Sequence, residues 1–245
     1  MIARKSVCSV SKIPTDYSLR RSVVVEVQTH NAKTRRGRIS YNCFMAEIPL
    51  FPLQMVLFPG GKTQLQIFEP RYLDMVRNCM RDQIGFGVVL IREGEQVLYD
   101  VDQQLPAVAH CGTYCSIVDF DQHHNGNLEI TIQGDVKFSI RDQYESPDRL
   151  MLAQVELLPL EEEQTVPPNK QHLVNLLESL ASHDAVQSLY HDVDYEDARD
   201  VGGRLTELLP CSNDFKQKML ELKNAEVRLR ELEKIILKMQ SSPPK

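Results

Sequence analysis

The chain has 245 residues, and its hydrophobic (42%) and charged (25%) fractions are those of a globular protein with a substantial core. The formal net charge is −6, yet nine Lys/Arg against two acidic residues give residues 1–44 a charge of +7, which leaves −13 for the rest. This acidic body argues against a nucleic-acid binder, and no apolar run approaches the roughly 20 residues of a membrane span.

The basic segment 1–44 is predicted to lie outside the folded unit. Met45 stands just before an apolar run, so we interpret the segment as disordered or as an extension upstream of the natural start. An organellar transit peptide is the alternative, because the segment is rich in Arg and Ser and poor in acidic residues. Scattered cysteines without a C-x-x-C pair predict reduced thiols and a cytoplasmic protein. These cysteines are Cys8, Cys43, Cys79, Cys111, Cys115 and Cys211.

Residues 48–72 place apolar strand formers between prolines and contain no nucleophile, metal-ligand set or phosphate cradle. After a turn at Gly60-Gly61, the alternation over 64–68 predicts a short strand. Glu69-Pro70 then predicts a helix start, because proline at the first helical position loses no hydrogen bond. The residues of this helix that recur at helical spacing, and so face a core, are Tyr72, Val76, Cys79 and Met80.

Several short strands with turns between them predict a small barrel or sandwich over residues 46–160. The clearest turn is Asn125-Gly126, because both residues accept the positive φ of a tight hairpin. The strands predicted on either side of that turn are Tyr114–Phe120 and Leu128–Ile132. The other predicted strands are Phe86–Ile91, Val136–Ile140 and Leu152–Leu158.

A charge run followed by a double proline, from Glu161 to Pro168, predicts a linker. Beyond it the apolar period is helical over residues 168–240, and three helices are expected. The first is marked by Leu173, Leu176, Leu177 and Leu180, and the second by Ala198, Val201, Leu205, Leu208 and Leu209. The third is expected to run unbroken from Ser212 or Asn213 to about Met239. We expect it to pack on its own subdomain, and coiled-coil pairing with another protein is the alternative.

None of the candidate motifs has the residue spacing that its chemistry requires. Gly60-Gly61-Lys62-Thr63 ends like a phosphate-binding loop but lacks the earlier glycine and leads into a strand. His183-Asp184 and His191-Asp192 resemble paired metal ligands, and Asp192–Asp197 resembles a calcium loop that lacks its glycine. We therefore predict no catalytic residue, no cofactor and no metal. The candidate zinc ligands, which match no usual zinc pattern, are His110, Cys111, Cys115, His123 and His124.

The chain resembles the N-terminal substrate-binding (LON) domain of ATP-dependent Lon proteases, especially the small stand-alone bacterial proteins that consist of this domain alone. The matching stretches are 48–53, 56–60, 67–72, 86–91, 112–113, 128–138 and 208–229, in the order of the family. One departure is Lys137, where the family commonly has arginine. The family-motif residues, which we interpret as structural, are Pro49, Pro52, Pro59, Gly60, Phe68, Glu69, Pro70, Arg71, Tyr72, Gly112, Thr113, Gly134 and Phe138.

The resemblance covers roughly residues 46–240 and implies an α+β fold. Its expected parts are a PUA-like small β-barrel with an inserted helix, then a C-terminal helical bundle that ends in a long helix. It implies a non-catalytic module that binds unfolded or tagged polypeptides or a partner protein, and substrate recognition linked to protein quality control is the expected role. The ATPase and Ser–Lys protease modules of full-length Lon have no room in the chain. RNA binding is the alternative, because PUA-like barrels often serve that purpose.

Overall fold

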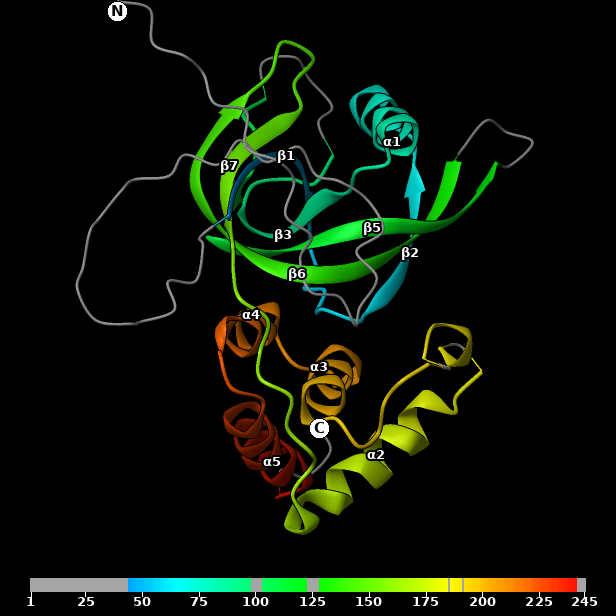
Figure 1. Ribbon diagram of the computed structural model, residues 1–245, viewed down its shortest axis with the longest axis vertical. Coiled ribbons are helices and arrows are strands. Elements are labelled where there is room, and N and C mark those ends of the chain that lie inside the picture. The colour runs from blue at the N-terminus through cyan, green and yellow to red at the C-terminus, as the bar shows by residue number, and fades with distance from the viewer. Residues whose placement is uncertain (1–43, 98–102, 123–127, 185, 191, 242–245) are drawn as a thin grey trace, which may run out of the picture.

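The computed structural model describes residues 44–97, 103–122, 128–184, 186–190 and 192–241, and these form a β-barrel followed by a helical subdomain (Figure 1). The strands are β1 (Phe44–Leu53), β2 (Lys62–Ile67), β3 (Phe86–Glu93), β4 (Ala107–Val108), β5 (Cys111–Gln122), β6 (Leu128–Glu145) and β7 (Met151–Leu157). The α-helices are α1 (Pro70–Asp82), α2 (Gln171–Ala181), α3 (Ala198–Leu208), α4 (Asn213–Glu221) and α5 (Ala225–Ser241). Short 3₁₀ turns occupy Pro168–Lys170 and Gln187–Leu189.

The sheet closes on itself because β1 pairs with two strands. The order is β1-β7-β6-β5-β3, all antiparallel neighbours, and a parallel pairing between β1 and β3 completes the ring. Strand β2 lies against β6 outside this ring, and β4 extends it beside β3. Within β1, residues 44–50 pair with β7 and residues 50–53 pair with β3. Pro49 and Pro52 fall in these separate stretches, where a strand need not donate N–H groups to both sides.

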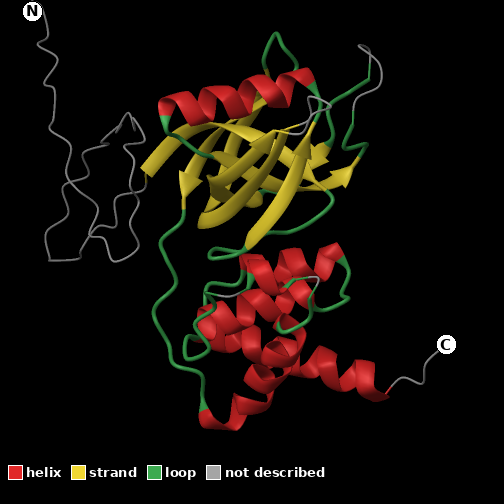
Figure 2. Cartoon of the chain, turned by 90° about the vertical axis from the view of Figure 1, so that its right-hand side faces the viewer, coloured by secondary structure: helices red, strands yellow, loops and turns green. Residues whose placement is uncertain are grey.

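Helix α1 covers one end of the barrel, and the helical subdomain lies at the other end (Figure 2). Glu69 is the N-cap of α1 and Pro70 its first residue, as the sequence predicts. The rings of Tyr72 and Phe51 of β1 pack edge to face, with ring centroids 4.2 Å apart. The expected small barrel with an inserted helix, followed by helices, is therefore confirmed.

The expectation of one unbroken helix from residue 213 to about 239 is wrong. Helix α4 ends at Glu221, Leu222 adopts an extended backbone, and α5 begins at Ala225. Asn224 caps the new helix, because its side-chain oxygen accepts the N–H of Val227 at 3.1 Å. The free carbonyls at the end of α4 are taken up by buried cations, described below. Contacts with residues distant in the sequence therefore end the helix at Glu221, where the spacing of the apolar residues predicts that it continues.

The predicted turn at Asn125-Gly126 and nearly all of segment 1–44 fall outside the described residues. The strands that flank the turn do pair antiparallel, with Gln122 opposite Leu128. Strand β6 continues through Gly134 as one strand, and the pairing of β5 with β6 shifts register between Tyr114 and Cys115. The last barrel strand ends at Leu157, and helical structure begins at Pro168.

The stability of the barrel should depend on the protonation of Asp135, which follows Gly134 and accepts a hydrogen bond from Ser116. Burial raises the pKa of Asp135 to about 6, against the lowering effect of that hydrogen bond. A raised carboxyl pKa contributes stability at pH values below the unfolded pKa of about 4 and loses it as the pH rises through 6.

We therefore expect Asp135→Asn to raise the free energy of unfolding at pH 8 by about 1–2 kcal/mol, since the residue is partly exposed and the full shift overstates the effect. Urea denaturation between pH 4 and pH 8 measures it. The decline of stability over that range should shrink in Asp135→Asn and persist in Asp121→Asn, whose side chain is exposed. Parallel pH curves for the wild type and Asp135→Asn would contradict the assignment.

Candidate functional site

The far end of β2, β5 and β6 presents an apolar surface, which we call the distal sheet surface. Register places Phe120 and Leu65 on either side of Ile130, so the three side chains share one face of the sheet. Phe68 and Phe120 are 55% and 57% exposed, and Val118 is 48% exposed, values high for large apolar side chains. We define this surface by the exposed Val118 and Phe120 of β5, the partly buried Leu65 and Leu128, and the exposed Phe68 directly after β2.

The outer part of β5 forms an open edge beside this surface. Strand β3 pairs with β5 only over Thr113–Cys115. Beyond Cys115, β6 pairs with one side of β5, and among the described residues no strand pairs with the other side. An edge of this kind leaves backbone N–H and C=O groups free for an added strand. Asp119 and Asp121 are exposed along it and give the edge negative charge.

Most family-motif residues lie where backbones approach one another closely. Gly60, with φ of +79°, donates its N–H to the Gly134 carbonyl, and the Gly134 N–H donates to the Gly61 carbonyl. A Cβ on Gly134 would meet the Phe58 carbonyl at 2.4 Å. A Cβ on Gly112 would meet the Phe138 ring at 2.6 Å, and Phe138 itself is fully buried.

The remaining motif residues fix the connections around the barrel. The Thr113 hydroxyl donates to the Leu57 carbonyl at 2.6 Å. Arg71 pairs with Glu69 and donates to the Arg149 carbonyl. Phe68 differs from the others, because over half of its side chain is exposed. A structural role for the motif set as a whole stays a prediction.

A buried ion cluster joins the barrel, the linker and the helical subdomain. Lys137 of β6 donates to Glu161 of the linker at 2.7 Å, and Arg228 of α5 donates to the same carboxylate oxygen. Lys137 and Arg228 are only 5% and 2% exposed. Burial would raise the pKa of Glu161, but Arg228 and Lys137 outweigh it and hold that pKa below its ordinary value. Glu161 is therefore ionised at neutral pH.

The same cations cap the end of α4. Lys137 donates to the carbonyls of Leu220 at 3.0 Å and Leu222 at 2.7 Å, and Arg228 donates to the Met219 carbonyl at 3.1 Å. These contacts satisfy carbonyls that a helix end leaves without partners. They explain why the chain turns at Leu222 and does not continue as helix.

A second buried cluster holds the Val56–Gly60 motif to α3. Glu207 accepts the Phe58 N–H at 2.8 Å and pairs with Arg204, whose guanidinium also donates to the Pro59 carbonyl at 3.0 Å. Tyr190 donates its hydroxyl to Glu207 at 3.3 Å. Burial raises the pKa of Glu207, while Arg204 opposes that shift. The side chains of Arg204 and Glu207 are 3% and 8% exposed.

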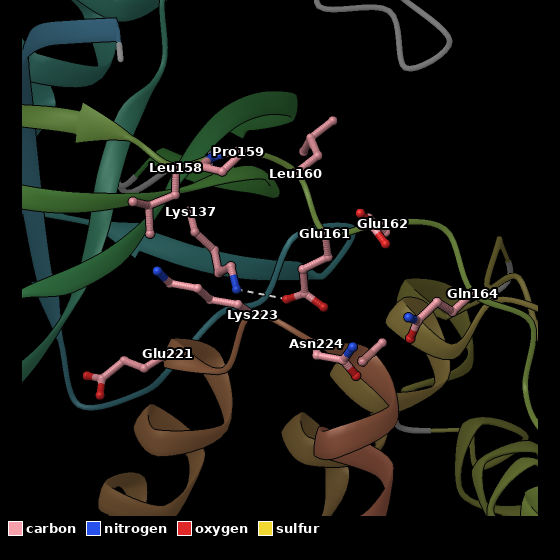
Figure 3. A pocket seen from close by; sticks show the side chains of 11 residues that line it. Lys137, Leu158, Pro159, Leu160, Glu161, Glu162, Gln164, Glu221, Lys223 and Asn224 are labelled. Atoms are coloured by element: carbon pink, nitrogen blue, oxygen red, sulfur yellow. Dashed lines mark hydrogen bonds and ion pairs between the residues drawn. The ribbon is translucent and has the colours of Figure 1, made fainter. Parts of the chain in front are cut away.

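A pocket of about 350 Å³ opens between the barrel and the helices beside the first cluster (Figure 3). Leu158, Pro159 and Leu160 of the linker supply an apolar wall, and Lys137 and Glu161 lie at its centre. Sequence patterns had marked Glu161 only as part of a linker and Lys137 only as a family departure. Arg204 and Glu207 were missed, and Arg228 entered only as part of the matching stretch 208–229, although each cation directly precedes a leucine of an apolar helical stripe.

The metal-ligand candidates that the sequence analysis rejects can be checked only where they lie in the described residues. Within the described ranges, no group of three or more His, Cys, Asp or Glu is placed to hold a metal ion. Cys111 and Cys115 are buried, and burial raises the pKa of Cys111 to about 11, so this thiol is a poor nucleophile. His123, His124 and His191 lie outside the described residues.

No described helix is long and apolar enough to cross a membrane.

Comparison with known proteins matches residues 47–238 to the family model of the ATP-dependent protease La (LON) substrate-binding domain. A Lon N-terminal domain protein from Xanthomonas campestris is similar in structure, with a TM-score of 0.61, 30% identity, and coverage of 76% of this chain and 96% of that one. The N-terminal domain of Mycobacterium avium complex Lon protease has a TM-score of 0.50 and 14% identity, covering 76% and 95%, so it supports the fold alone.

A curated relative is similar over a shorter stretch. Protein cereblon from Xenopus tropicalis is 26% identical over 117 residues, which are 46% of this chain and 24% of that protein. The chain therefore matches about a quarter of the length of this relative.

Proposed function

Because this chain belongs to the LON substrate-binding domain family, we propose that it is a non-catalytic module that binds extended polypeptides at the distal sheet surface. The observation that carries the proposal is the open edge of β5, which carries the exposed Phe120; the exposed Phe68 lies two strands away, directly after the end of β2. A large apolar side chain exposed on an unpaired strand is well placed to contact a segment that adds to that strand. Unfolded polypeptides and partner proteins with an extended segment both have the chemistry that this surface fits.

Binding would proceed by strand addition. An extended segment aligned with β5 beyond Cys115 gives main-chain hydrogen bonds that do not depend on its sequence. Alternate side chains of the segment then lie beside Phe120, on the same face of the sheet. The exposed Asp119 and Asp121 favour segments that carry Lys or Arg nearby. Such a surface accepts many sequences, as a substrate-recognition module requires.

We expect the double substitution Phe68→Ser and Phe120→Ser to weaken binding of an unfolded polypeptide by about tenfold or more, because exposed aromatic side chains often dominate such interfaces. Fluorescence anisotropy with a labelled, permanently unfolded polypeptide measures the Kd. The matched control is Leu237→Ser on α5, a large apolar side chain that is 59% exposed and far from the surface in sequence and fold.

Both variants should fold as the wild type does, since the replaced side chains lie largely in solvent. Equal affinity for the wild type and the double variant would remove the distal sheet surface from the proposal. Failure of a varied polypeptide panel to reach saturation would remove polypeptide binding altogether. A single-stranded RNA of the same length tests the alternative partner, whose binding should fall steeply with salt if it occurs.

A role in protein quality control and a cytoplasmic site of action remain part of this proposal. The free thiols of Cys79, Cys111, Cys115 and Cys211 support a reducing compartment. Cross-linking in cells, followed by identification of the captured proteins, tests the role. Recovery of unfolded or newly made chains would support quality control, and recovery of one folded partner would favour a dedicated adaptor.

A further inference from the structure

The pocket beside Glu161 has one apolar wall and one polar wall. Its volume of about 350 Å³ lies at the small end of the range for ligand sites, roughly 300–1,000 Å³. The apolar wall comes from Leu158, Pro159 and Leu160, and the polar wall comes from Glu161, Gln164 and Asn224 (Figure 3). The pocket does not belong to the distal sheet surface, because it lies between the barrel and the helices.

The two cations that bind Glu161 are largely committed to acceptors of the chain. Lys137 donates to Glu161, to the Leu220 carbonyl and to the Leu222 carbonyl, which uses all three of its N–H groups. Arg228 is committed to Glu161 and to the carbonyls of Met219 and Leu222. An anionic ligand would therefore find no free N–H on Lys137, the pocket-lining cation that binds Glu161.

The groups that lack a partner are acceptors. Both cations bind the same oxygen of Glu161, Oε1, and its Oε2 is buried without a hydrogen-bond partner among the described residues. The Gln164 Oε1 atom is buried and equally without a partner there. The Glu161 side chain is nine-tenths buried, so its unpaired oxygen carries a desolvation cost that an incoming donor would remove.

The charge around these acceptors favours a neutral donor. Glu161, Glu162 and Glu221 contribute three negative charges, which Lys137, Lys223 and the adjacent Arg228 balance. An ammonium group would place a third cation against Glu161, which Lys137 and Arg228 already neutralise. Asn224 accepts the Val227 N–H with its side-chain oxygen, which leaves its side-chain nitrogen to donate to a carbonyl oxygen.

We propose that this pocket binds a primary carboxamide, whose two N–H groups donate to Glu161 Oε2 and Gln164 Oε1 and whose oxygen accepts from Asn224. The aliphatic part of the ligand packs on Leu158 and Leu160. Resting on the proposed function, the inference assigns this carboxamide to an Asn or Gln side chain of the bound polypeptide. A free small amide presents the same chemistry and is distinguished by the experiment.

The test compares heptapeptides that are acetylated at the N-terminus and N-methylamidated at the C-terminus, so that a central Gln is the only primary carboxamide. The matched peptide carries Met, which has a similar shape and no N–H donors. Isothermal titration should show the Gln peptide binding about tenfold or more tightly, because the Met peptide leaves both acceptors unpaired. Equal affinity of the two peptides would overturn the inference.

The diagnostic variant is Gln164→Met, which removes a buried unpaired acceptor and keeps the backbone contact of Gln164 with Ala198. We expect it to abolish the preference for Gln over Met while the free energy of unfolding stays the same or rises. Gln171→Met, at the exposed start of α2, is the control and should keep the preference. A preference that survives in Gln164→Met contradicts the site, and so does a loss of preference that appears equally in the control.

A small-molecule arm identifies the source of the amide. N-acetylglutamine methylamide that binds as tightly as the Gln peptide would overturn the polypeptide assignment and point to a free amide ligand. Unfolded polypeptides that bind without any Gln preference would overturn this site and leave the proposed function standing. A Gln164-dependent signal from the small amide, with no polypeptide binding, would keep the site and remove the proposed function.

Discussion

Replacing Glu161 by alanine should lower the free energy of unfolding by about 3–5 kcal/mol, because it leaves two buried cations without their counter-ion. Lys137 and Arg228 are almost wholly shielded from solvent, and no second carboxylate is paired with either of them in the described structure. Since small domains have a total stability of only about 5–15 kcal/mol, a loss of this size is a large fraction of it. Urea denaturation at pH 7 measures the change.

The matched control is Glu163→Ala, two residues along the same linker. Glu163 is 82% exposed and pairs with Arg199 at 3.3 Å, so its loss should cost less than about 1 kcal/mol. Glu161→Gln keeps the shape of the side chain but brings no negative charge. It should therefore lower the free energy of unfolding by most of the amount expected for Glu161→Ala. Equal denaturation midpoints for Glu161→Ala and the wild type would show that the cluster contributes no net stability.

Acid should produce part of the same effect in the wild type. The pKa of Glu161 is lowered in the folded state, so its contribution is present above the unfolded pKa and is lost as the pH falls through the folded pKa. Acid unfolding should therefore begin at a higher pH in Glu161→Ala, which lacks that contribution throughout, when the two proteins are compared by circular dichroism.

Local patterns in the sequence were enough to predict the elements that local physics determines. The alternation over 64–68 and the Glu69-Pro70 step predict β2 and α1, and both are observed. The helical period after the double proline predicts α2 and α3 for the same reason. The prediction of one unbroken helix from residue 213 to about 239 is wrong at Leu222. There the carbonyls of Leu220 and Leu222 accept hydrogen bonds from Lys137, some 80 residues earlier in the chain.

The candidate sites were beyond what the sequence alone could predict. A lysine next to Phe138 is expected to face water when β6 is considered by itself, since alternate residues of a strand face opposite sides. Its burial depends on α4 and the linker covering the second face of β6, which no local pattern encodes. Phe68 is the converse case, because it is part of a motif that we interpret as structural and yet over half of its side chain is exposed.

The second buried cluster should be as important for stability as the first, and Glu207→Ala tests it. The substitution leaves the Arg204 guanidinium buried without its counter-ion and the Phe58 N–H without its acceptor. We expect the free energy of unfolding to fall by about 3–5 kcal/mol. The matched control is Glu231→Ala, which removes an i,i+3 ion pair of the same spacing on α5, where Lys234 is 66% exposed. That control should cost about 0.5 kcal/mol or less.

Hydrogen exchange distinguishes a specific effect of Glu207 from a general loss of packing. Because Glu207 accepts the N–H of Phe58, this amide should exchange faster in Glu207→Ala even under conditions where the barrel stays folded. The Gly60 amide, which donates to the Gly134 carbonyl inside the barrel, should keep most of its protection. Unchanged exchange at Phe58, or an equal rise at Phe58 and Gly60, would mean that Glu207 does not hold this loop of the barrel to α3.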